Sequence, residues 1–133
     1  MSQRGKQANA DANDLRVLLV DDHDLFRTGL RNLLEEQGVQ IVGEASNGLD
    51  AIRCVREVAP DVVVMDLNMP GLDGWMSMSL IKARRPKLPV VVLTGDVGKD
   101  LESRAKTAGA AGFLTKPCQP DALIRTLKKA TSR

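Results

Sequence analysis

Several apolar runs of this sequence end in side chains that can do chemistry. The residues that follow the runs are Asp21 and Asp22, Asp66, Thr94 and, two residues past the last run, Lys116. If these side chains meet, their three carboxylates repel one another. A divalent cation relieves that repulsion, and a few carboxylates together with substrate phosphate are the usual ligands of Mg²⁺. The residue types therefore predict phosphoryl chemistry beside a magnesium ion.

Each of three side chains suits one part of a phosphoryl transfer. Asp66 can act as a carboxylate nucleophile, as in enzymes that form an aspartyl phosphate. Lys116 supplies a mobile positive charge for a phosphoryl oxygen, and Thr94 supplies a hydroxyl donor. In-line phosphoryl transfer consists mainly of positioning and charge neutralisation. These three residues are the candidate catalytic set.

The apolar runs are the elements that must position this set. Most are rich in valine and continuous rather than alternating, which is typical of strands buried on both faces of a parallel sheet. The predicted strands contain residues 17–20, 41–42, 62–65, 90–93 and 113–114. Ligands of open α/β sheets bind outside the carboxyl ends of the strands. Four of these five strands would therefore deliver a reactive or charged side chain to one edge.

Between the runs, apolar residues recur at the spacing of an amphipathic helix. The predicted stripes are Leu25, Phe26, Leu30, Leu33 and Leu34; Ala51, Ile52, Val55, Val58 and Ala59; Met76, Leu80 and Ile81; Leu101, Ala105 and Ala108; and Leu123, Leu127 and Ala130. The predicted boundary residues are Gly38, Pro60 and Gly109 at helix ends, Asp73 as a cap, and Pro120 in a first turn. Five strand–helix units predict an α/β fold with a doubly wound parallel sheet and right-handed crossovers. Periodicity alone does not fix the strand order.

The composition excludes several classes of function. Lys and Arg number 19 and Asp and Glu 17 among 133 residues, so the net charge of +2 predicts no general affinity for nucleic acid or an anionic membrane. No apolar run approaches the length of a membrane span. Cys54 and Cys118 lie far apart and form no metal-ligand pattern, which favours a reduced, cytoplasmic protein. Residues 1–14 are predicted to be a disordered leader and residues 15–133 one domain.

Together the motifs resemble the receiver domain of two-component response regulators. The resemblance rests on Asp21-Asp22, Asp66, Thr94 and Lys116-Pro117, each after its own strand, and runs from Arg16 to Ala130. The segment 66–74 also matches the family pattern D-x-x-M-P-x-x-D-G. Residues 21–30 are similar to the NarL/FixJ-type subfamily, whose members carry a C-terminal helix-turn-helix. The resemblance implies a flavodoxin-like, CheY-like (βα)5 fold with strand order 2-1-3-4-5.

The resemblance also implies a role for each site residue. Asp66 would accept the phosphoryl group from a phosphohistidine on a histidine kinase or a histidine phosphotransfer protein. Asp22 would bind Mg²⁺ directly and Asp21 directly or through water, with Asp66 and the backbone carbonyl of Asn68 completing the protein ligands. Lys116 and Thr94 would hold the phosphoryl oxygens. The family's bond at Lys116–Pro117 is cis, and we expect the same here.

In the family, phosphorylation changes a distant surface through a switch. Here the switch residues would be Thr94 and Phe113, and the surface would be the fourth helix, fifth strand and fifth helix. That surface would dock a partner or a second copy of the chain. The domain would not be a conventional enzyme, because it would catalyse only its own phosphorylation and dephosphorylation. The sequence ends after the fifth helix, so we expect no DNA-reading domain and no direct contact with nucleic acid.

Three alternatives remain open on the sequence. Haloacid dehalogenase-type phosphatases also use an Asp nucleophile, but their second Asp is replaced here by Asn68. A flavodoxin-like binding module would need a phosphate-binding loop where this chain has Asp21-Asp22-His23-Asp24. A stand-alone receiver and one belonging to a DNA-binding regulator or a hybrid kinase fit equally well. His23, the single histidine, is interpreted as a loop or cap residue because no second metal-binding histidine accompanies it.

Overall fold

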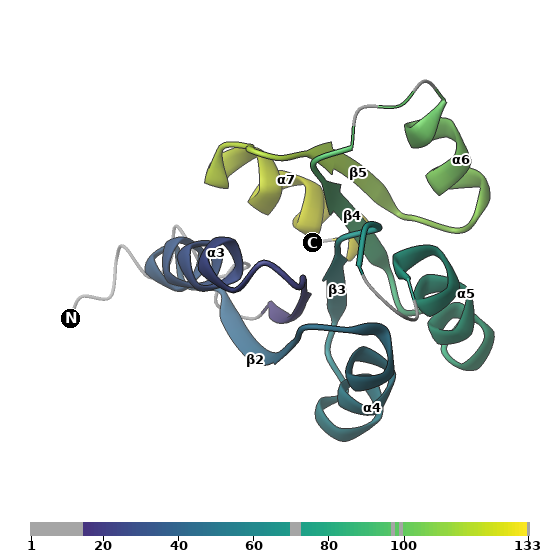
Figure 1. Cartoon of the computed structure of the whole chain (residues 1–133). Coiled ribbons are helices and arrows are strands. Elements are labelled where there is room, and N and C mark those ends of the chain that lie inside the picture. The colour runs from purple at the N-terminus through teal and green to yellow at the C-terminus, as the bar shows by residue number, and fades with distance from the viewer. Residues whose placement is uncertain (1–14, 70–72, 97, 99, 133) are drawn as a thin grey trace.

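Strands and helices alternate along the chain in a computed structural model (Figure 1), which describes residues 15–69, 73–96, 98 and 100–132. The strands are β1 (Arg16–Val20), β2 (Gln40–Ala45), β3 (Val62–Met65), β4 (Val90–Thr94) and β5 (Gly112–Thr115). The helices are α3 (Asp24–Glu36), α4 (Gly48–Val58), α5 (Gly74–Arg84), α6 (Leu101–Thr107) and α7 (Pro120–Ala130). The predicted disordered leader, residues 1–14, lies outside the described residues, as do residues 70–72 of the D-x-x-M-P-x-x-D-G segment.

The strands form one parallel sheet in the order β2-β1-β3-β4-β5. This is the doubly wound, five-stranded order that the receiver resemblance implies, so the predicted fold is confirmed. The register places Val20 beside both Ala45 and Met65, and Thr94 beside Thr115. The carboxyl ends of neighbouring strands therefore meet at one edge of the sheet.

Helices cover both faces of this sheet (Figure 1). α3 and α7 pack on one face, and α4, α5 and α6 pack on the other. Successive residues of a strand enter opposite layers, so Leu18 packs towards α4 and α5 while Leu19 packs towards α3 and α7. Because both faces of the central strands are covered, their sequences are continuous apolar runs rather than alternating ones.

The predicted helix boundaries are borne out by the local geometry. Gly38 and Gly109 follow α3 and α6 with φ angles of 92° and 109°, a left-handed conformation that glycine adopts without strain. Asp73 caps α5 by accepting the backbone N–H of Met76 at 2.9 Å. Pro120 is the first residue of α7. None of the described helices is both long and apolar enough to cross a membrane.

α3 exposes part of its predicted stripe, although Phe26, Leu30 and Leu34 pack in the core as predicted, and α5 turns a different face to the core. In α3, Leu25 is 91% exposed and Leu33 is 44% exposed, whereas Leu34 is buried. In α5, Met76 is 56% exposed and Leu80 is 41% exposed. The prediction that these four exposed side chains face the core is therefore wrong. In α3 the reason is position, because Leu25 belongs to the first turn, above the carboxyl end of the sheet.

The ends of α4 and α6 need a smaller correction. Ala59 and Ala108, which the sequence places in apolar stripes, are the C-cap residues of these helices and are exposed. The last turn of a helix leaves the layer it packs on, so apolar spacing there does not imply burial.

In α5 the reason for the different face is a close approach of backbones. The buried residues of this helix are Gly74, Ser77, Met78 and Ile81. Small side chains at the first two positions let the helix start lie directly against the end of β3. Ser77 remains compatible with burial because its hydroxyl donates to the backbone oxygen of Asp73 at 2.7 Å. The start of α5 is thus set by contact with the backbone that carries Asp66.

Gly74 provides a test of that contact. A Cβ atom at Gly74 would lie 2.3 Å from the backbone oxygen of Asp66 and 2.4 Å from the Cα of Leu67. We expect Gly74→Ala to lower the free energy of unfolding in urea by about 1–3 kcal/mol because the backbones must separate. Gly29→Ala is the control, since nothing lies within 4 Å of a Cβ there; it should raise stability by about 0.5–1 kcal/mol. Equal stability of the two variants would contradict the close-approach argument.

Candidate functional site

The backbone hydrogen bonds of the parallel sheet continue past the ends of the strands and include residues of the predicted site. Asp21 donates its N–H to the oxygen of Ala45 at 3.0 Å, and Asp66 donates to Val20 at 3.0 Å. On the other side, Lys116 donates its N–H to Thr94 at 2.8 Å. The site residues are therefore held by the same interaction that holds the strands.

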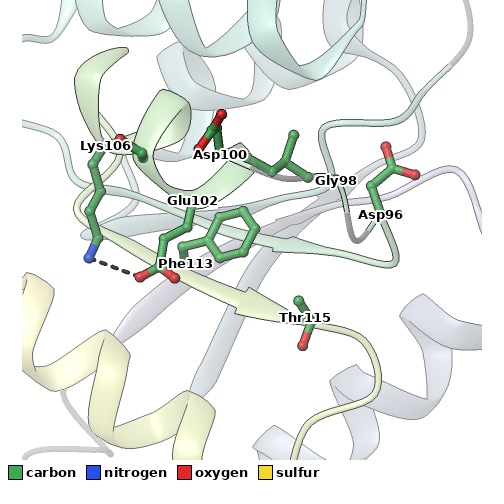
Figure 2. Close-up of a pocket in the computed structure, with 9 residues that line it drawn as sticks. Asp96, Gly98, Asp100, Glu102, Lys106, Phe113 and Thr115 are labelled. Carbon is green, nitrogen blue, oxygen red and sulfur yellow. Dashed lines mark ion pairs between the residues drawn. The ribbon is translucent and has the colours of Figure 1, made fainter.

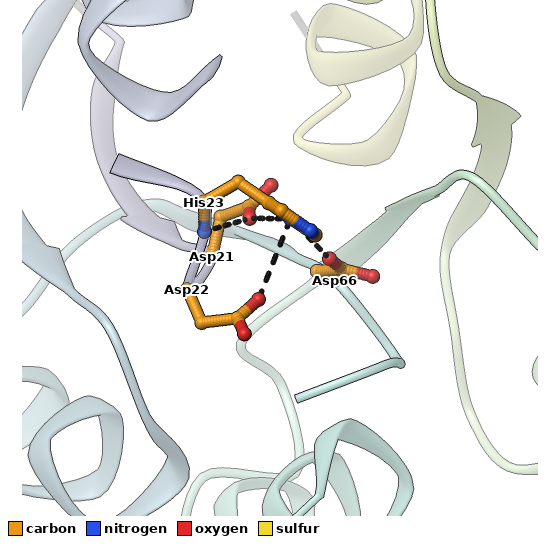
Figure 3. A group of neighbouring side chains, drawn as sticks. All are labelled: Asp21, Asp22, His23 and Asp66. Atoms are coloured by element: carbon orange, nitrogen blue, oxygen red, sulfur yellow. Dashed lines mark hydrogen bonds and ion pairs between the residues drawn. The ribbon is translucent and has the colours of Figure 1, made fainter. Parts of the chain in front are cut away.

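This arrangement brings the carboxylates together. Asp21, Asp22 and Asp66 each offer an oxygen to one group, and His23 offers a ring nitrogen, with all four atoms within 4.8 Å of one another (Figure 3). Asp21 is 5% exposed and Asp66 is 2% exposed. Water screens such buried charges poorly, so their mutual repulsion is strong. The predicted convergence of three carboxylates at one edge of the sheet is present.

Lys116 offsets part of this negative charge. Its Nζ lies 2.7 Å from Asp21 Oδ2 and 3.0 Å from Asp66 Oδ2. Burial alone would lower the pKa of the Lys116 ammonium, but its bonds to the two carboxylates outweigh burial and hold the pKa above its ordinary value of 10.5. The group therefore stays charged at neutral pH. The bond from Lys116 to Pro117 is cis, as the family resemblance implies.

One oxygen of the group is left without a hydrogen bond. Asp22 Oδ1 is buried and has no hydrogen-bond partner among the described residues. Asp66 Oδ1, by contrast, accepts the backbone N–H of Asn68 at 3.0 Å, which places the Asn68 backbone against the site. An unsatisfied buried carboxylate oxygen beside two further carboxylates is the donor set that a hard divalent cation takes. The residues present therefore fit Mg²⁺.

Arg27 is a second cation at the site, and the sequence analysis missed it. Its guanidinium donates to the backbone oxygen of Asp21 at 2.5 Å and to Glu44 Oε1 at 2.9 Å. Asp24 completes the contacts at 3.0 Å. The side chain is only 15% exposed and joins α3 to both β1 and β2. The one available signal was its place inside the segment 21–30 that resembles the NarL/FixJ-type subfamily.

The two predicted switch residues lie on neighbouring strands. Thr94 is fully buried at the end of β4, and its hydroxyl accepts the N–H of Asp96 at 3.3 Å. Phe113 is half-buried on β5 and lines a groove of about 610 Å³ beside α6 (Figure 2). Glu102 and Lys106 form an ion pair at 2.9 Å on the wall of that groove. Phe113 therefore borders an open groove into which surrounding side chains can repack.

A separate cavity of about 550 Å³ gives access to Asp66. Its lining includes His23, Leu25, Asn68 and Lys116. The cavity is large enough for a phosphoryl group and the end of a partner side chain. It opens at the carboxyl edge of the sheet, where ligands of such folds bind.

The structure confirms His23 as a cap residue and adds contacts that the sequence did not predict. The residue is the N-cap of α3, as expected, but its side chain makes no capping hydrogen bond. The ring instead lies among the carboxylates, with Nδ1 2.9 Å from Asp21 Oδ1 (Figure 3). A lone histidine carries no metal-ligand spacing, so the sequence offered no signal for this placement.

Comparisons with known proteins agree with this geometry. Residues 17–128 match the model of the response regulator receiver domain family. The chain is 39% identical over 119 residues to the response regulator UvrY of Escherichia coli K12, covering 89% of this chain and 55% of UvrY. It is 41% identical over 130 residues to the transcriptional regulatory protein PdtaR of Mycobacterium tuberculosis H37Rv, covering 97% of this chain and 63% of PdtaR. The chain thus spans less than two thirds of these relatives.

A solved structure shares the fold at a lower sequence identity. The signal receiver domain of a response regulator NarL from Mycobacterium tuberculosis superposes with a TM-score of 0.82 at 30% identity, covering 89% of this chain and 96% of that one. The family match decides against the dehalogenase-type and flavodoxin-type alternatives. With the sheet order, the acidic group and the paired lysine in place, the chain belongs to the response regulator receiver domain family of two-component signal transduction.

Proposed function

We propose that this receiver domain takes a phosphoryl group onto Asp66 from the phosphohistidine of a histidine kinase or a histidine phosphotransfer protein. The observation that carries the proposal is the setting of the Asp66 carboxylate. It is 2% exposed, lines the open cavity of about 550 Å³, and lies 3.0 Å from Lys116 Nζ. A carboxylate held in this way can attack a phosphorus atom that enters through the cavity.

The transfer makes one bond and breaks one. An Asp66 oxygen forms a bond to phosphorus, and the phosphorus–nitrogen bond of the donor histidine breaks. The electron pair of that bond stays on the donor imidazole, which then takes a proton. The Asp66 carboxylate is oriented by two donors: the Asn68 N–H bonds Oδ1 and the Lys116 ammonium bonds Oδ2, each at 3.0 Å. Positioning of this kind is most of what phosphoryl transfer requires.

Receiver domains generally bind Mg²⁺ at an acidic pocket, and we propose that the reaction here depends on it. Asp21, Asp22, Asp66 and the backbone carbonyl of Asn68 would hold the ion. When bound, it would supply charge neutralisation for the carboxylates and for the phosphoryl oxygens. Lys116 and Thr94 would bind the remaining phosphoryl oxygens through the ammonium and the hydroxyl.

The proposed output is a change in the surface formed by α6, β5 and α7. α6 has only seven residues, of which Ala105 is buried, so little apolar area holds it in place. A modest difference in free energy can shift such an element. If Thr94 moves towards a phosphorylated Asp66, Phe113 can turn inward from the groove in Figure 2 and reshape its wall.

That surface would dock either a partner or a second copy of the chain. As a receiver, the domain is a signalling module, and we propose that it catalyses only its own phosphorylation and dephosphorylation. The absence of direct contact with nucleic acid stays a prediction, because this chain corresponds to only part of its curated relatives.

The acceptor assignment is tested by mass. With Mg²⁺ and acetyl phosphate, the parent should gain one phosphoryl group by intact-protein mass spectrometry, and Asp66→Asn should gain none because the amide is not a nucleophile. Asp121→Asn, an exposed acid on α7 far along the chain, is the matched control and should label like the parent. Undiminished labelling of Asp66→Asn would remove Asp66 from the role.

The metal assignment is tested by stability. Asp22 Oδ1 is buried without a hydrogen bond. In a buffer that contains a metal chelator, Asp22→Ala should therefore raise the free energy of unfolding by about 1 kcal/mol, because repulsion among the carboxylates is relieved. The same variant should lose Mg²⁺ binding and phosphorylation. Glu36→Ala, exposed at the end of α3, should do neither. An Asp22→Ala protein that binds Mg²⁺ normally would refute the assignment.

The switch is tested by amide exchange with and without a beryllofluoride mimic of the phosphoryl group. In the parent, exchange should change at the active-site loops and across residues 100–115. In Thr94→Ala and Phe113→Ala, the change across residues 100–115 should shrink while phosphorylation remains measurable. Thr28→Ala, exposed on α3, serves as the control. Changes confined to α3 or α4 would place the output surface elsewhere.

A further inference from the structure

His23 enters the acidic group in a way that neither its helix nor the core explains. Its Nδ1 lies 2.9 Å from Asp21 Oδ1, 3.4 Å from Asp22 Oδ1 and 3.7 Å from Asp66 Oδ2 (Figure 3). The side chain is 61% exposed, so packing does not hold it there. The N–H of its own backbone already bonds Asp21 Oδ1 at 2.8 Å. Nδ1 of the ring also forms hydrogen-bond contacts with Asp21 Oδ1 at 2.9 Å and Lys116 Nζ at 3.3 Å, so an ion bound by this nitrogen would replace those contacts.

The three distances match the spacing of ligands around one cation. With metal–ligand lengths of about 2.0–2.2 Å, adjacent ligand atoms lie about 3 Å apart. Nδ1 stands at that spacing from Asp21 Oδ1 and slightly beyond it from the other two oxygens. Without an ion, the 2.9 Å contact with Asp21 Oδ1 is a hydrogen bond that Nδ1 donates; with the ring proton on Nε2, the Nδ1 lone pair would instead point into the group.

One cation, the Lys116 ammonium, already lies beside Nδ1, and a metal ion bound by the ring would have to displace it. Lys116 Nζ lies 3.3 Å from the same nitrogen while it pairs with Asp21 and Asp66. Asp22 Oδ1, beside the ring, is buried and lacks a hydrogen bond. A cation between these atoms would satisfy that oxygen and the imidazole together.

We propose that His23 is a ligand, through Nδ1, for divalent transition metal ions at the acidic site. Mg²⁺ takes oxygen ligands and leaves imidazole outside its sphere, whereas Co²⁺, Ni²⁺ and Zn²⁺ bind imidazole well. The site then holds two classes of cation by different donor sets: oxygens alone for Mg²⁺, and oxygens plus the His23 nitrogen for the others. His23 is thus a residue that sets metal selectivity. The inference rests on the proposed metal site.

Titration calorimetry with Mg²⁺ and with Co²⁺, each as the chloride salt, tests the proposal on the whole chain. His23→Ala should weaken Co²⁺ binding by at least about tenfold, as expected for loss of a direct ligand. It should weaken Mg²⁺ binding far less than Co²⁺ binding, because Mg²⁺ takes oxygen ligands. Leu25→Ala is the matched control, because Leu25 is 91% exposed and lines the same cavity. It should leave the binding of both ions unchanged, and His23→Gln should behave like His23→Ala.

Proton NMR supplies a readout that a merely structural role would not move. The Co²⁺ form of the parent and of Leu25→Ala should show a strongly shifted exchangeable resonance from the ring N–H of a coordinated imidazole. His23 is the single histidine of the chain, so His23→Ala and His23→Gln should lack it. Absence of the resonance in the parent, or equal loss of Mg²⁺ and Co²⁺ affinity in the variants, would overturn the proposal.

Phosphorylation separates this inference from the proposed function. With Mg²⁺ and acetyl phosphate, His23→Ala should still be phosphorylated on Asp66. If the shifted resonance appears but Asp66 is never phosphorylated, the proposal that His23 is a ligand is supported and the acceptor role of Asp66 is wrong. If Asp66 is phosphorylated but the Co²⁺ affinity is the same in the parent and in His23→Ala, the acceptor role is supported and the proposal that His23 is a ligand is wrong.

Discussion

The site depends on the continuation of a parallel hydrogen-bond ladder past the ends of its strands. The N–H groups of Asp21 and Asp66 bond the last residues of β2 and β1, and that of Lys116 bonds the last residue of β4. These bonds fix the backbone position of each site residue along the strand direction. The residues that carry the side chains therefore cannot move apart. The proximity of buried carboxylates is therefore imposed by backbone geometry, and their repulsion has to be offset locally.

Lys116 provides that offset directly, and a second cation, Arg27, holds the backbone of the loop that carries Asp21. Lys116 pairs directly with the carboxylates of Asp21 and Asp66, at the end of a flexible chain that can follow an incoming phosphoryl group. Arg27 bonds the backbone oxygen of Asp21 and is itself held by Glu44 and Asp24. The planar guanidinium suits this rigid role, since it bonds several fixed oxygens at once. One cation thus pairs with the site carboxylates, and the other supports the loop.

Much of this arrangement was predictable from local pattern. Valine-rich runs, the Asp73 cap and the residues after each strand follow rules of single segments, and the predicted fold and convergence of carboxylates are present. The strand order came from family resemblance, because periodicity carries no information on which strands are neighbours.

What the pattern missed depends on contacts between segments. The inward face of α5 follows from the approach of Gly74 to the Asp66 backbone, and apolar spacing does not encode such a contact. Arg27 and His23 look like ordinary residues of a helix start, and their importance appears only when β2, β3 and β5 surround them. Sequence patterns therefore fail to predict the roles of site residues whose partners are distant from them in the sequence.

The place of Lys116 in the chain has a consequence for synthesis. Asp21 and Asp66 leave the ribosome well before Lys116, which follows Asp66 by 50 positions and comes after β5. A nascent chain with four strands would carry the carboxylates without their ammonium partner, on a sheet that still lacks its edge strand. The ammonium that balances the charge of the site follows β5, so the proposed acceptor site is complete only after β5 has paired with β4. The proposed phosphorylation would therefore require that the edge strand has already joined the sheet.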